Sequence, residues 1–357
     1  MNISNFPCHD FKTQPFAAWS LNDETRLRSA SGGGFAELAH QIFKEGGAVA
    51  GAMTRGTDIF HTIIESPEEL QRLQGSKYLQ SNTVGVYRKT LEYLQKGRMV
   101  LFSGTPCQVA AILRFISDKR YTGMLYTCDL ICHGVPSHAL FKIYLQNQKK
   151  KVQEIISFRD KAVSWKNSFA MTVKYANGEV RRNEYSKDFF LNFFGLGLSL
   201  RKSCYQCPFA TLSRATDISL GDFWGIKSWP EQHKNGVSLI IVHSEKGLDF
   251  LRRTKGLEIH SATWEDALPL NPRIYNGRNM MGRFPPRFFL AQALKYLPYP
   301  LLIKLYGNIM PKTHFWWWPY KFVLISYLKM ASQIKRIRLK NMFKKLGEQK
   351  KDRDDEN

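Results

Sequence analysis

The spacing of apolar residues between positions 30 and 150 predicts a regular alternation of helices and strands. Phe35, Leu38 and Ile42 recur at the interval of an α-helix, directly after a glycine-rich turn at 31–34. The rest of this region is predicted to form strands at 48–53, 60–65, 98–104 and 123–132 and helices at 66–73, 86–97 and 107–116. Strands that alternate with helices at such short distances are typical of an α/β core, which we place in a domain at 21–150.

The pattern changes after a lysine run at 149–151. The segment 169–186 holds two alternating runs around Asn177-Gly178, which is a strong β-hairpin signal. We therefore predict an α+β domain at 151–285. Residues 1–20 are expected to form an irregular arm, and residues 286–357 a helical basic tail. The predicted fold class is an α/β core followed by an α+β region and a C-terminal aromatic and basic helical segment.

The composition limits the class of protein. The chain has 357 residues, of which 43% are hydrophobic, so it can bury a sizeable core and is not disordered as a whole. No stretch approaches the roughly 20 apolar residues that a membrane-spanning helix needs. The first residues lack the charged and then apolar pattern of a signal peptide, so a cytoplasmic location is expected.

The chain carries a large excess of basic residues. Lys and Arg number 52 against 30 Asp and Glu, a net charge of +22, which favours anionic partners. Much of the excess lies near the C-terminus, in Lys329, Lys335, Arg336, Arg338, Lys340, Lys344, Lys345, Lys350, Lys351 and Arg353. No recognised nucleic-acid-binding motif accompanies this charge, so nucleic acid is not an expected partner.

Residues 313–345 combine aromatic, apolar and basic side chains. Trp316, Trp317, Trp318 and Tyr320 precede a short apolar run and then a series of lysines and arginines. The apolar run is too short to span a bilayer, but the order suits an interfacial helix with its indole rings at headgroup level. Peripheral contact with an anionic membrane on its inner face is one interpretation. A helix docked on the protein, followed by a solvated basic tail, is the other.

Cysteines without a secretion signal indicate metal binding or redox chemistry rather than a disulfide framework. Cys107 follows Thr-Pro at a helix start, where free amides and the helix dipole favour a thiolate. Cys132 ends a predicted strand, at the edge where α/β folds place ligands. With the C-x-x-C pair at 204–207 they could hold zinc or a [4Fe–4S] cluster, although Cys107 and Cys132 could also be small buried residues. Cys128, inside a strand, is interpreted as core, and Cys8 has no evident partner.

The turn Ser31-Gly32-Gly33-Gly34 precedes a predicted helix and suits an anion. Glycines permit close backbone approach, and the amides and dipole of a helix start favour phosphate. The spacing matches neither the G-x-G-x-x-G fingerprint nor a P-loop, so a turn without a ligand is the alternative interpretation.

Six segments occur in a fixed order along the chain. They are SASGGGFAELAHQIFKEGGAVAGA, LQGSKYLQS, VLFSGTPCQVAAI, DLICHGVPS, CYQCPFATLSRATDISLGDFWG and NGVSLIIV. Together they resemble the coenzyme F-420 hydrogenase/dehydrogenase beta-subunit family, and in particular its bacterial members associated with polysaccharide biosynthesis. The resemblance extends over about residues 15–245, and the combination of G-T-P-C-Q with D-x-x-C-H-G-V-P is quite specific.

This resemblance implies an iron–sulfur flavoprotein oxidoreductase, in which FAD lies beside a [4Fe–4S] cluster and electrons pass between the cluster and a bound acceptor. The cluster ligands of the family map onto Cys107, Cys132, Cys204 and Cys207. Its glycine-rich flavin-side segment maps onto Ser31, Gly32, Gly33 and Gly34, and we extend it to Lys77 as a further contact for cofactor phosphates.

The resemblance also guides the expected chemistry. His133 and Asp222 are candidate proton donors or substrate contacts, with purely structural roles as the alternative. Many relatives begin with a ferredoxin-like domain of two four-cysteine runs, whereas only Cys8 precedes residue 20 here. We therefore expect a separate electron-carrier protein (ferredoxin-like) or a deazaflavin-type coenzyme as partner, and an organic acceptor in exopolysaccharide or O-antigen biosynthesis. The alternative class is a non-redox protein with a structural metal that scaffolds glycan-building enzymes at the membrane.

Overall fold

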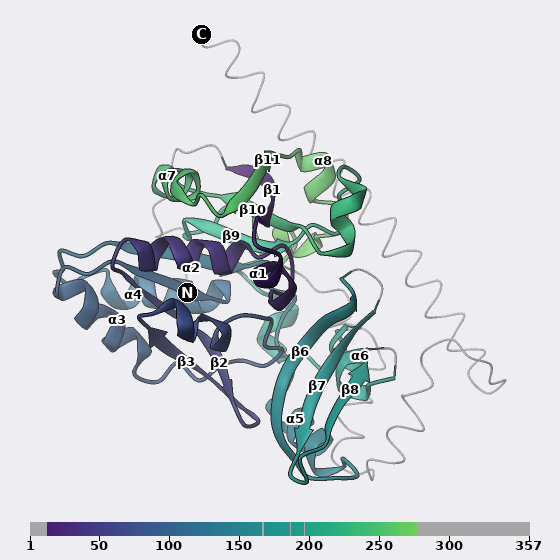
Figure 1. Cartoon of the computed structure of the whole chain (residues 1–357). Coiled ribbons are helices and arrows are strands. Elements are labelled where there is room, and N and C mark those ends of the chain that lie inside the picture. The colour runs from purple at the N-terminus through teal and green to yellow at the C-terminus, as the bar shows by residue number, and fades with distance from the viewer. Residues whose placement is uncertain (1–12, 166–167, 186, 196, 278–357) are drawn as a thin grey trace. The chain divides into compact units, whose positions relative to one another are not determined.

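An eight-stranded mixed sheet dominates the computed structural model, which describes residues 13–165, 168–185, 187–195 and 197–277 (Figure 1). Its strands follow the order β11-β1-β10-β9-β5-β4-β2-β3. The four strands β9, β5, β4 and β2 are parallel, and the strands on both sides of them are antiparallel. The strands are β1 (Gln14–Ser20), β2 (Ala48–Arg55), β3 (Asp58–Ile64), β4 (Val100–Gly104), β5 (Leu125–Leu130), β9 (Ile218–Asp222), β10 (Ser238–Val242) and β11 (Leu257–Ser261).

Helices cover both faces of this sheet. They are α2 (Gly34–Lys44) and α7 (Glu245–Arg253) on one face, and α3 (Val86–Gln95) and α4 (Pro106–Ile116) on the other. Side chains of β4 alternate between the two hydrophobic clusters: Leu101 belongs to the cluster with α2 and α7, whereas Val100 and Phe102 belong to the cluster with α3 and α4. The sheet is therefore buried on both faces, as parallel strands require.

A second, three-stranded sheet lies between β5 and β9 in the sequence. It consists of β6 (Val152–Ser164), β7 (Ser168–Tyr175) and β8 (Val180–Glu184), in that order. Gly178 has a φ of +86° in the turn between β7 and β8, a conformation that side chains other than glycine rarely adopt. Two helices, α5 (His138–Gln146) and α6 (Phe189–Gly195), pack against this sheet through Phe141 and Phe190.

Short helical segments complete the described chain. They are α1 (Asp23–Arg28), α8 (Trp264–Ala267) and the 3-10 helices η2 (Pro67–Arg72), η3 (Lys202–Tyr205), η4 (Pro230–Lys234) and η5 (Pro272–Ile274). The helix expected at 66–73 is thus a 3-10 turn, and the Ser66 side chain makes no capping hydrogen bond there. The capping box at the start of α4 does form, because the Gln108 side chain accepts a hydrogen bond from the Thr105 amide.

The predicted fold class is confirmed as an α/β core with a further α+β region, but two boundaries differ from expectation. Residues 14–20, expected in an irregular arm, form β1 in the large sheet, where β1 pairs with β10 and β11. The segment 218–261, expected within the second domain, supplies β9, β10 and β11 to the same sheet. Pairing between distant segments explains both differences. The predicted helical tail at 286–357 lies outside the described residues.

The parallel strands bring three loops to one edge of the large sheet. Gly104 at the end of β4 pairs with Asp129 of β5, and Leu130 pairs with Leu220 of β9. The chain segments that follow these strands therefore begin side by side at their carboxyl ends. This is the edge at which open α/β sheets bind ligands.

Candidate cofactor cavity and cysteine site

A cavity of about 320 Å³ opens at this edge of the sheet. Its walls come from the glycine-rich turn, the loop at 73–81, and the segments that follow β4, β5 and β9. Most of the residues singled out from the sequence line it: Ser31, Gly33, Gly34, Lys77, Cys132, His133 and Asp222. The volume lies within the range of small-molecule sites, which begins at about 300 Å³.

The glycine-rich turn is shaped by packing against β1 and β10. A Cβ atom on Gly32 would lie 2.5 Å from the backbone oxygen of Ala18 and 2.6 Å from the nitrogen of Ser238, and Gly33 has a φ of +97°. The Ser31 hydroxyl donates to the Val237 carbonyl, and the Gly32 amide donates to the Ser238 hydroxyl. Gly32 does not line the cavity. The residues of the turn that line it are Ser31 and, at the start of α2, Gly33 and Gly34.

Two lysines hold the loops around the cavity. Lys77 Nζ donates to the carbonyl oxygens of Leu73, Gln74 and Gly75 at 2.8, 2.7 and 3.2 Å, so its hydrogen bonds fix its own loop. Lys161 of β6 donates to the Ser31 carbonyl at 2.5 Å and so ties the second sheet to the glycine-rich turn. Burial lowers the pKa of each lysine to about 7.

Asp222 is already engaged by two neighbours. Its Oδ2 pairs with Arg159 of β6, and its Oδ1 accepts a hydrogen bond from the Trp165 indole at 2.8 Å. Arg159 also hydrogen-bonds to the Tyr78 hydroxyl, and its guanidinium lies 4.9 Å from the centre of the Trp224 ring. Asp222 is therefore placed to orient Arg159 at the cavity wall.

His133 differs from Asp222, whose carboxylate is held by two neighbours. Its ring makes no hydrogen bond to any residue in the described part of the chain, and it lines the cavity. The side chain is exposed to solvent, yet the protein around the ring desolvates it and lowers its pKa, with Asp222 acting in the other direction. An imidazole whose nitrogens make no hydrogen bond to described residues can donate or accept a proton.

A buried chain of hydrogen bonds runs along the cavity wall and was not foreseen from the sequence. Gln108 Nε2 donates to Ser81 Oγ at 2.9 Å, Ser81 Oγ lies 2.7 Å from His61 Nδ1, and His61 Nε2 lies 2.9 Å from the Ser103 carbonyl. Because a carbonyl can only accept, His61 carries its proton on Nε2. Burial lowers the pKa of His61 to about 4, so the ring stays neutral. A histidine inside the alternating strand 60–65 was the only available signal.

The cysteines at 107, 132, 204 and 207 gather beside the cavity. The Cys107 thiol interacts electrostatically with those of Cys207 and Cys204, and the Cys132 thiol with those of Cys107 and Cys204. A Cβ atom on Gly134 would lie 3.1 Å from Cys204 Cβ, which shows that the loop after β5 touches η3. Cys132 is the member of the set that also lines the cavity.

The character of the thiols differs in part from expectation. Burial raises the pKa of Cys107, although its side chain reaches the surface, whereas the helix start was expected to lower it. Burial also raises the pKa of Cys132 to about 12, against a hydrogen bond of 3.4 Å from the Gly134 amide to its sulfur. Cys128 is fully buried in the hydrophobic core, as expected, and Cys8 lies outside the described residues.

The donor set fits a soft metal or an iron–sulfur cluster, because it consists of thiols together with an amide N–H directed at sulfur. The thiols do not form a closed ligand shell: among the described residues, no three His, Cys, Asp or Glu side chains are arranged to hold a metal ion. Binding would therefore require changes in side-chain conformation and loss of the thiol protons.

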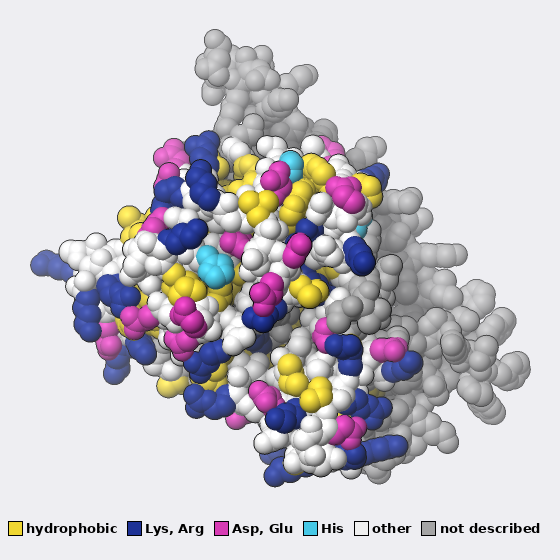
Figure 2. Space-filling view, in the orientation of Figure 1, with side chains coloured by type: hydrophobic (Ala, Val, Ile, Leu, Met, Phe, Trp, Pro, Cys, Tyr) yellow, Lys and Arg dark blue, Asp and Glu magenta, His cyan; other side chains and the backbone are white. Residues whose placement is uncertain are grey.

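Charge is mixed on the face shown in Figure 2, where Lys and Arg side chains are interspersed with Asp and Glu. On this face the described residues form no single basic surface of the kind that binds nucleic acid. No helix in the described segments is long and apolar enough to cross a membrane.

Comparison with known proteins adds the following. Residues 97–263 match the family described as the C terminus of the coenzyme F420 hydrogenase/dehydrogenase beta subunit. Among solved structures, a chain of the F420-reducing [NiFe] hydrogenase complex from Methanosarcina barkeri is similar, with 15% sequence identity and a TM-score of 0.49 over 73% of this chain and 87% of that chain. No curated protein sequence matches. Over residues 97–263, which include all four gathered cysteines, the chain is thus matched by this C-terminal family of F420 hydrogenases and dehydrogenases.

Proposed function

We propose that this protein is an iron–sulfur flavoprotein oxidoreductase, with FAD in the cavity and a [4Fe–4S] cluster on Cys107, Cys132, Cys204 and Cys207. The observation that carries the proposal is the position of Cys132, which belongs both to the cavity wall and to the gathered cysteines. A cofactor in the cavity and a group held by the thiols would therefore be neighbours. The match of residues 97–263 to a hydrogenase/dehydrogenase family supports the same reaction class.

Two features of the cavity support a flavin as its occupant. Ile131, Val135 and Leu220 give it apolar walls, and the start of α2 offers amides and a helix dipole to an anionic group. Lys77 adds positive charge when protonated, with a pKa that burial lowers to about 7, although its hydrogen bonds go to its own loop. A flavin and an iron–sulfur cluster supply hydride and one-electron chemistry respectively, and the protein supplies binding and orientation.

The polar groups of the wall have separate tasks in this proposal. His133, which lines the cavity and makes no hydrogen bond to described residues, exchanges the proton that accompanies hydride transfer to the acceptor. Asp222 holds Arg159 against the wall, where the guanidinium can orient an anionic or carbonyl-bearing acceptor. The His61 chain, whose ring stays neutral, fixes another part of the wall without adding charge.

The partners and setting are extensions of this proposal. Electrons come from a ferredoxin-like carrier protein or a deazaflavin-type coenzyme, and the acceptor is an intermediate of polysaccharide biosynthesis. The sequence resemblance of residues 15–245 supports these assignments. A cytoplasmic location, with residues 313–345 in peripheral contact with an anionic membrane, completes the proposal.

The test is the cofactor content of full-length protein purified without oxygen. We expect a yellow-brown protein that releases FAD on denaturation and contains iron and sulfide. Cys132→Ser should remove iron, whereas the matched control Cys128→Ser should keep it, because Cys128 lies in the core. Zinc without flavin would refute the proposal and support the alternative, a structural-metal protein that scaffolds glycan-building enzymes.

A further inference from the structure

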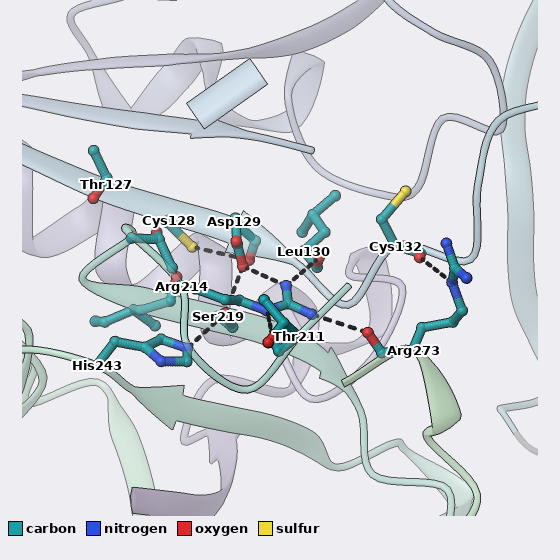
Figure 3. A network of polar contacts seen from close by, with 12 residues as sticks. Thr127, Cys128, Asp129, Leu130, Cys132, Thr211, Arg214, Ser219, His243 and Arg273 are labelled. Carbon is teal, nitrogen blue, oxygen red and sulfur yellow. Dashed lines mark hydrogen bonds and ion pairs between the residues drawn. The ribbon is translucent and has the colours of Figure 1, made fainter. Parts of the chain in front are cut away.

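Arg273 is a buried arginine whose guanidinium joins the two halves of the cysteine site. It lies in η5 and is 5% exposed. Its Nε donates to the carbonyl oxygen of Cys132 at 3.3 Å, and its Nη2 donates to the carbonyl oxygen of Cys204 at 3.2 Å. Figure 3 shows the first of these bonds, with Arg273 beside Cys132. One side chain thus connects the loop after β5 to η3.

The remaining donors of Arg273 extend this connection to Cys207. Its Nη1 donates to the carbonyl oxygens of Asn276 and Gly277, each at 3.2 Å. The Gly277 carbonyl also accepts a hydrogen bond from the Cys207 amide at 2.8 Å. Arg273 is therefore linked through backbone atoms to Cys132, Cys204 and Cys207.

The charge of Arg273 has no acidic partner among the described residues, since every bond given above goes to a backbone carbonyl. Its neighbour Arg214 differs, because Arg214 pairs with Asp129 at 3.0 Å and both side chains are almost fully buried. Arg214 also donates to the Arg273 carbonyl at 3.1 Å, which fixes η5 in place (Figure 3). A buried cation without a counter-charge is costly unless an anion comes to lie close to it.

The nearby cysteines are the group that can supply this anion. Thiols become thiolates when they bind a metal, and a cluster or metal held by four thiolates is negatively charged overall. We propose that Arg273 is the positioning and charge-balancing residue of the cysteine site: it aligns Cys132 and Cys204 through their carbonyl oxygens and offsets the negative charge of the loaded site. This inference rests on the metal-binding part of the proposed function and is independent of the flavin.

The two roles predict different results for two substitutions. Arg273→Gln removes both the charge and most of the carbonyl bonds, whereas Arg273→Lys keeps the charge but cannot reach both carbonyl oxygens in the same way. Arg201→Gln is the matched control, because Arg201 precedes η3 but is exposed to solvent, which screens its charge. Thermal unfolding and circular dichroism of each full-length variant check that it folds.

The first measurement is Co²⁺ binding to the full-length, metal-depleted protein, followed by thiolate-to-cobalt absorption. We expect both Arg273 variants to bind Co²⁺ about 10–100-fold more weakly than the parent, as for other residues that orient metal ligands, and Arg201→Gln to bind it unchanged. Folded Arg273→Gln with the parent's affinity would overturn the positioning role. A Co²⁺ site that depends on Arg273, in a protein that lacks flavin, would leave this inference intact while the redox function fails.

The second measurement is the midpoint potential of the cluster in protein purified without oxygen. Reduction adds negative charge, so loss of the buried cation should lower the potential in Arg273→Gln, and Arg273→Lys should restore most of it. A purely structural arginine would leave the two variants equal. Equal potentials in both variants, or an equal shift in Arg201→Gln, would overturn the charge-balancing role.

Discussion

At the scale of single residues, Asp129 and Arg214 form an ion pair from which water is excluded. Their side chains are 2% and 3% exposed, and Asp129 also accepts a hydrogen bond from Ser219. Asp129→Asn would leave Arg214 buried without a counter-charge, so we expect a loss of about 3–5 kcal/mol in the free energy of unfolding, measured with urea. Glu69→Gln, which breaks the exposed pair with Arg72, should cost at most about 1 kcal/mol. Similar losses of unfolding free energy in both variants would contradict the exclusion of water from the Asp129–Arg214 pair.

Lys161 gives a prediction for the dependence of stability on pH. Burial lowers its pKa in the folded protein to about 7, from an ordinary value of 10.5. Between these values the unfolded chain binds the proton and the folded chain releases it, so stability rises with pH, by at most about 1.4 kcal/mol per pH unit from this group. Below about pH 7 Lys161 is protonated in both the folded and the unfolded chain, so its contribution to stability no longer changes with pH.

The check on Lys161 is thermal unfolding between about pH 6.5 and 9.5. Lys161→Met should show a smaller rise of the midpoint temperature with pH than the parent protein, and exposed Lys89→Met should show the parent's rise. Part of the rise should persist in Lys161→Met, because burial lowers the pKa of Lys77 to about 7 as well. An identical rise in parent and Lys161→Met would show that Lys161 is not desolvated.

At the scale of elements, the glycine-rich turn owes its composition to packing as much as to any ligand. A methyl group on Gly32 would press on the backbone of β1 and β10, whereas one on Gly34 would meet its nearest atoms at 3.4 Å. We expect Gly32→Ala to lower the free energy of unfolding by about 1–3 kcal/mol and Gly34→Ala to change it by less than about 1 kcal/mol. Urea unfolding of the two variants tests this, and equal effects would argue against the close approach.

Local patterns in the sequence account for much of the core. The helix after the glycine-rich turn and the strands around it follow from apolar spacing. The residues that each of them buries recur at the helix or strand period within a short stretch of sequence. The hairpin around Asn177-Gly178 follows from turn chemistry. The helix predicted at 66–73 is a 3-10 helix instead, since a Ser-Pro-Glu-Glu sequence also suits the short 3-10 helix that forms there.

The candidate site could be predicted only in part, because local sequence patterns mark some of its residues and not others. Cys107 and Cys132 could be chosen because Cys107 lies at the start of a predicted helix and Cys132 at the end of a predicted strand, and such ends meet at one edge of a parallel sheet. Arg159, Lys161 and Arg273 reach the site from segments distant in sequence, and no local pattern marks them.

At the scale of the whole described chain, long-range pairing decides the architecture. β1 near the N-terminus lies between β10 and β11, which come more than 200 residues later. The sequence of β1 has no clear alternation, so it could be placed only through partners that sequence spacing does not reveal. This closure places the glycine-rich turn beside Val237 and Ser238, and so forms one side of the cavity.

Residues 313–345 carry a prediction for the intact protein, although they lie outside the described residues. We expect full-length protein to cosediment with anionic liposomes at low salt and to bind less at raised ionic strength, because charge is screened and apolar burial is not. Deletion of residues 313–357 should abolish cosedimentation without loss of cofactor. Full-length protein that stays in the supernatant at low salt would show that the segment does not bind membranes.

Anaerobic reductive titration of the full-length protein, followed by visible absorption, tests the central claim most directly. If the cavity and the cysteine site hold a flavin and a cluster, both absorption bands should bleach, and the electrons taken up should exceed those that the released FAD alone can accept. Cys132→Ser should remove the cluster's share, and Cys128→Ser should keep it. A colourless protein that takes up no electrons, or one that contains zinc alone, would contradict the account.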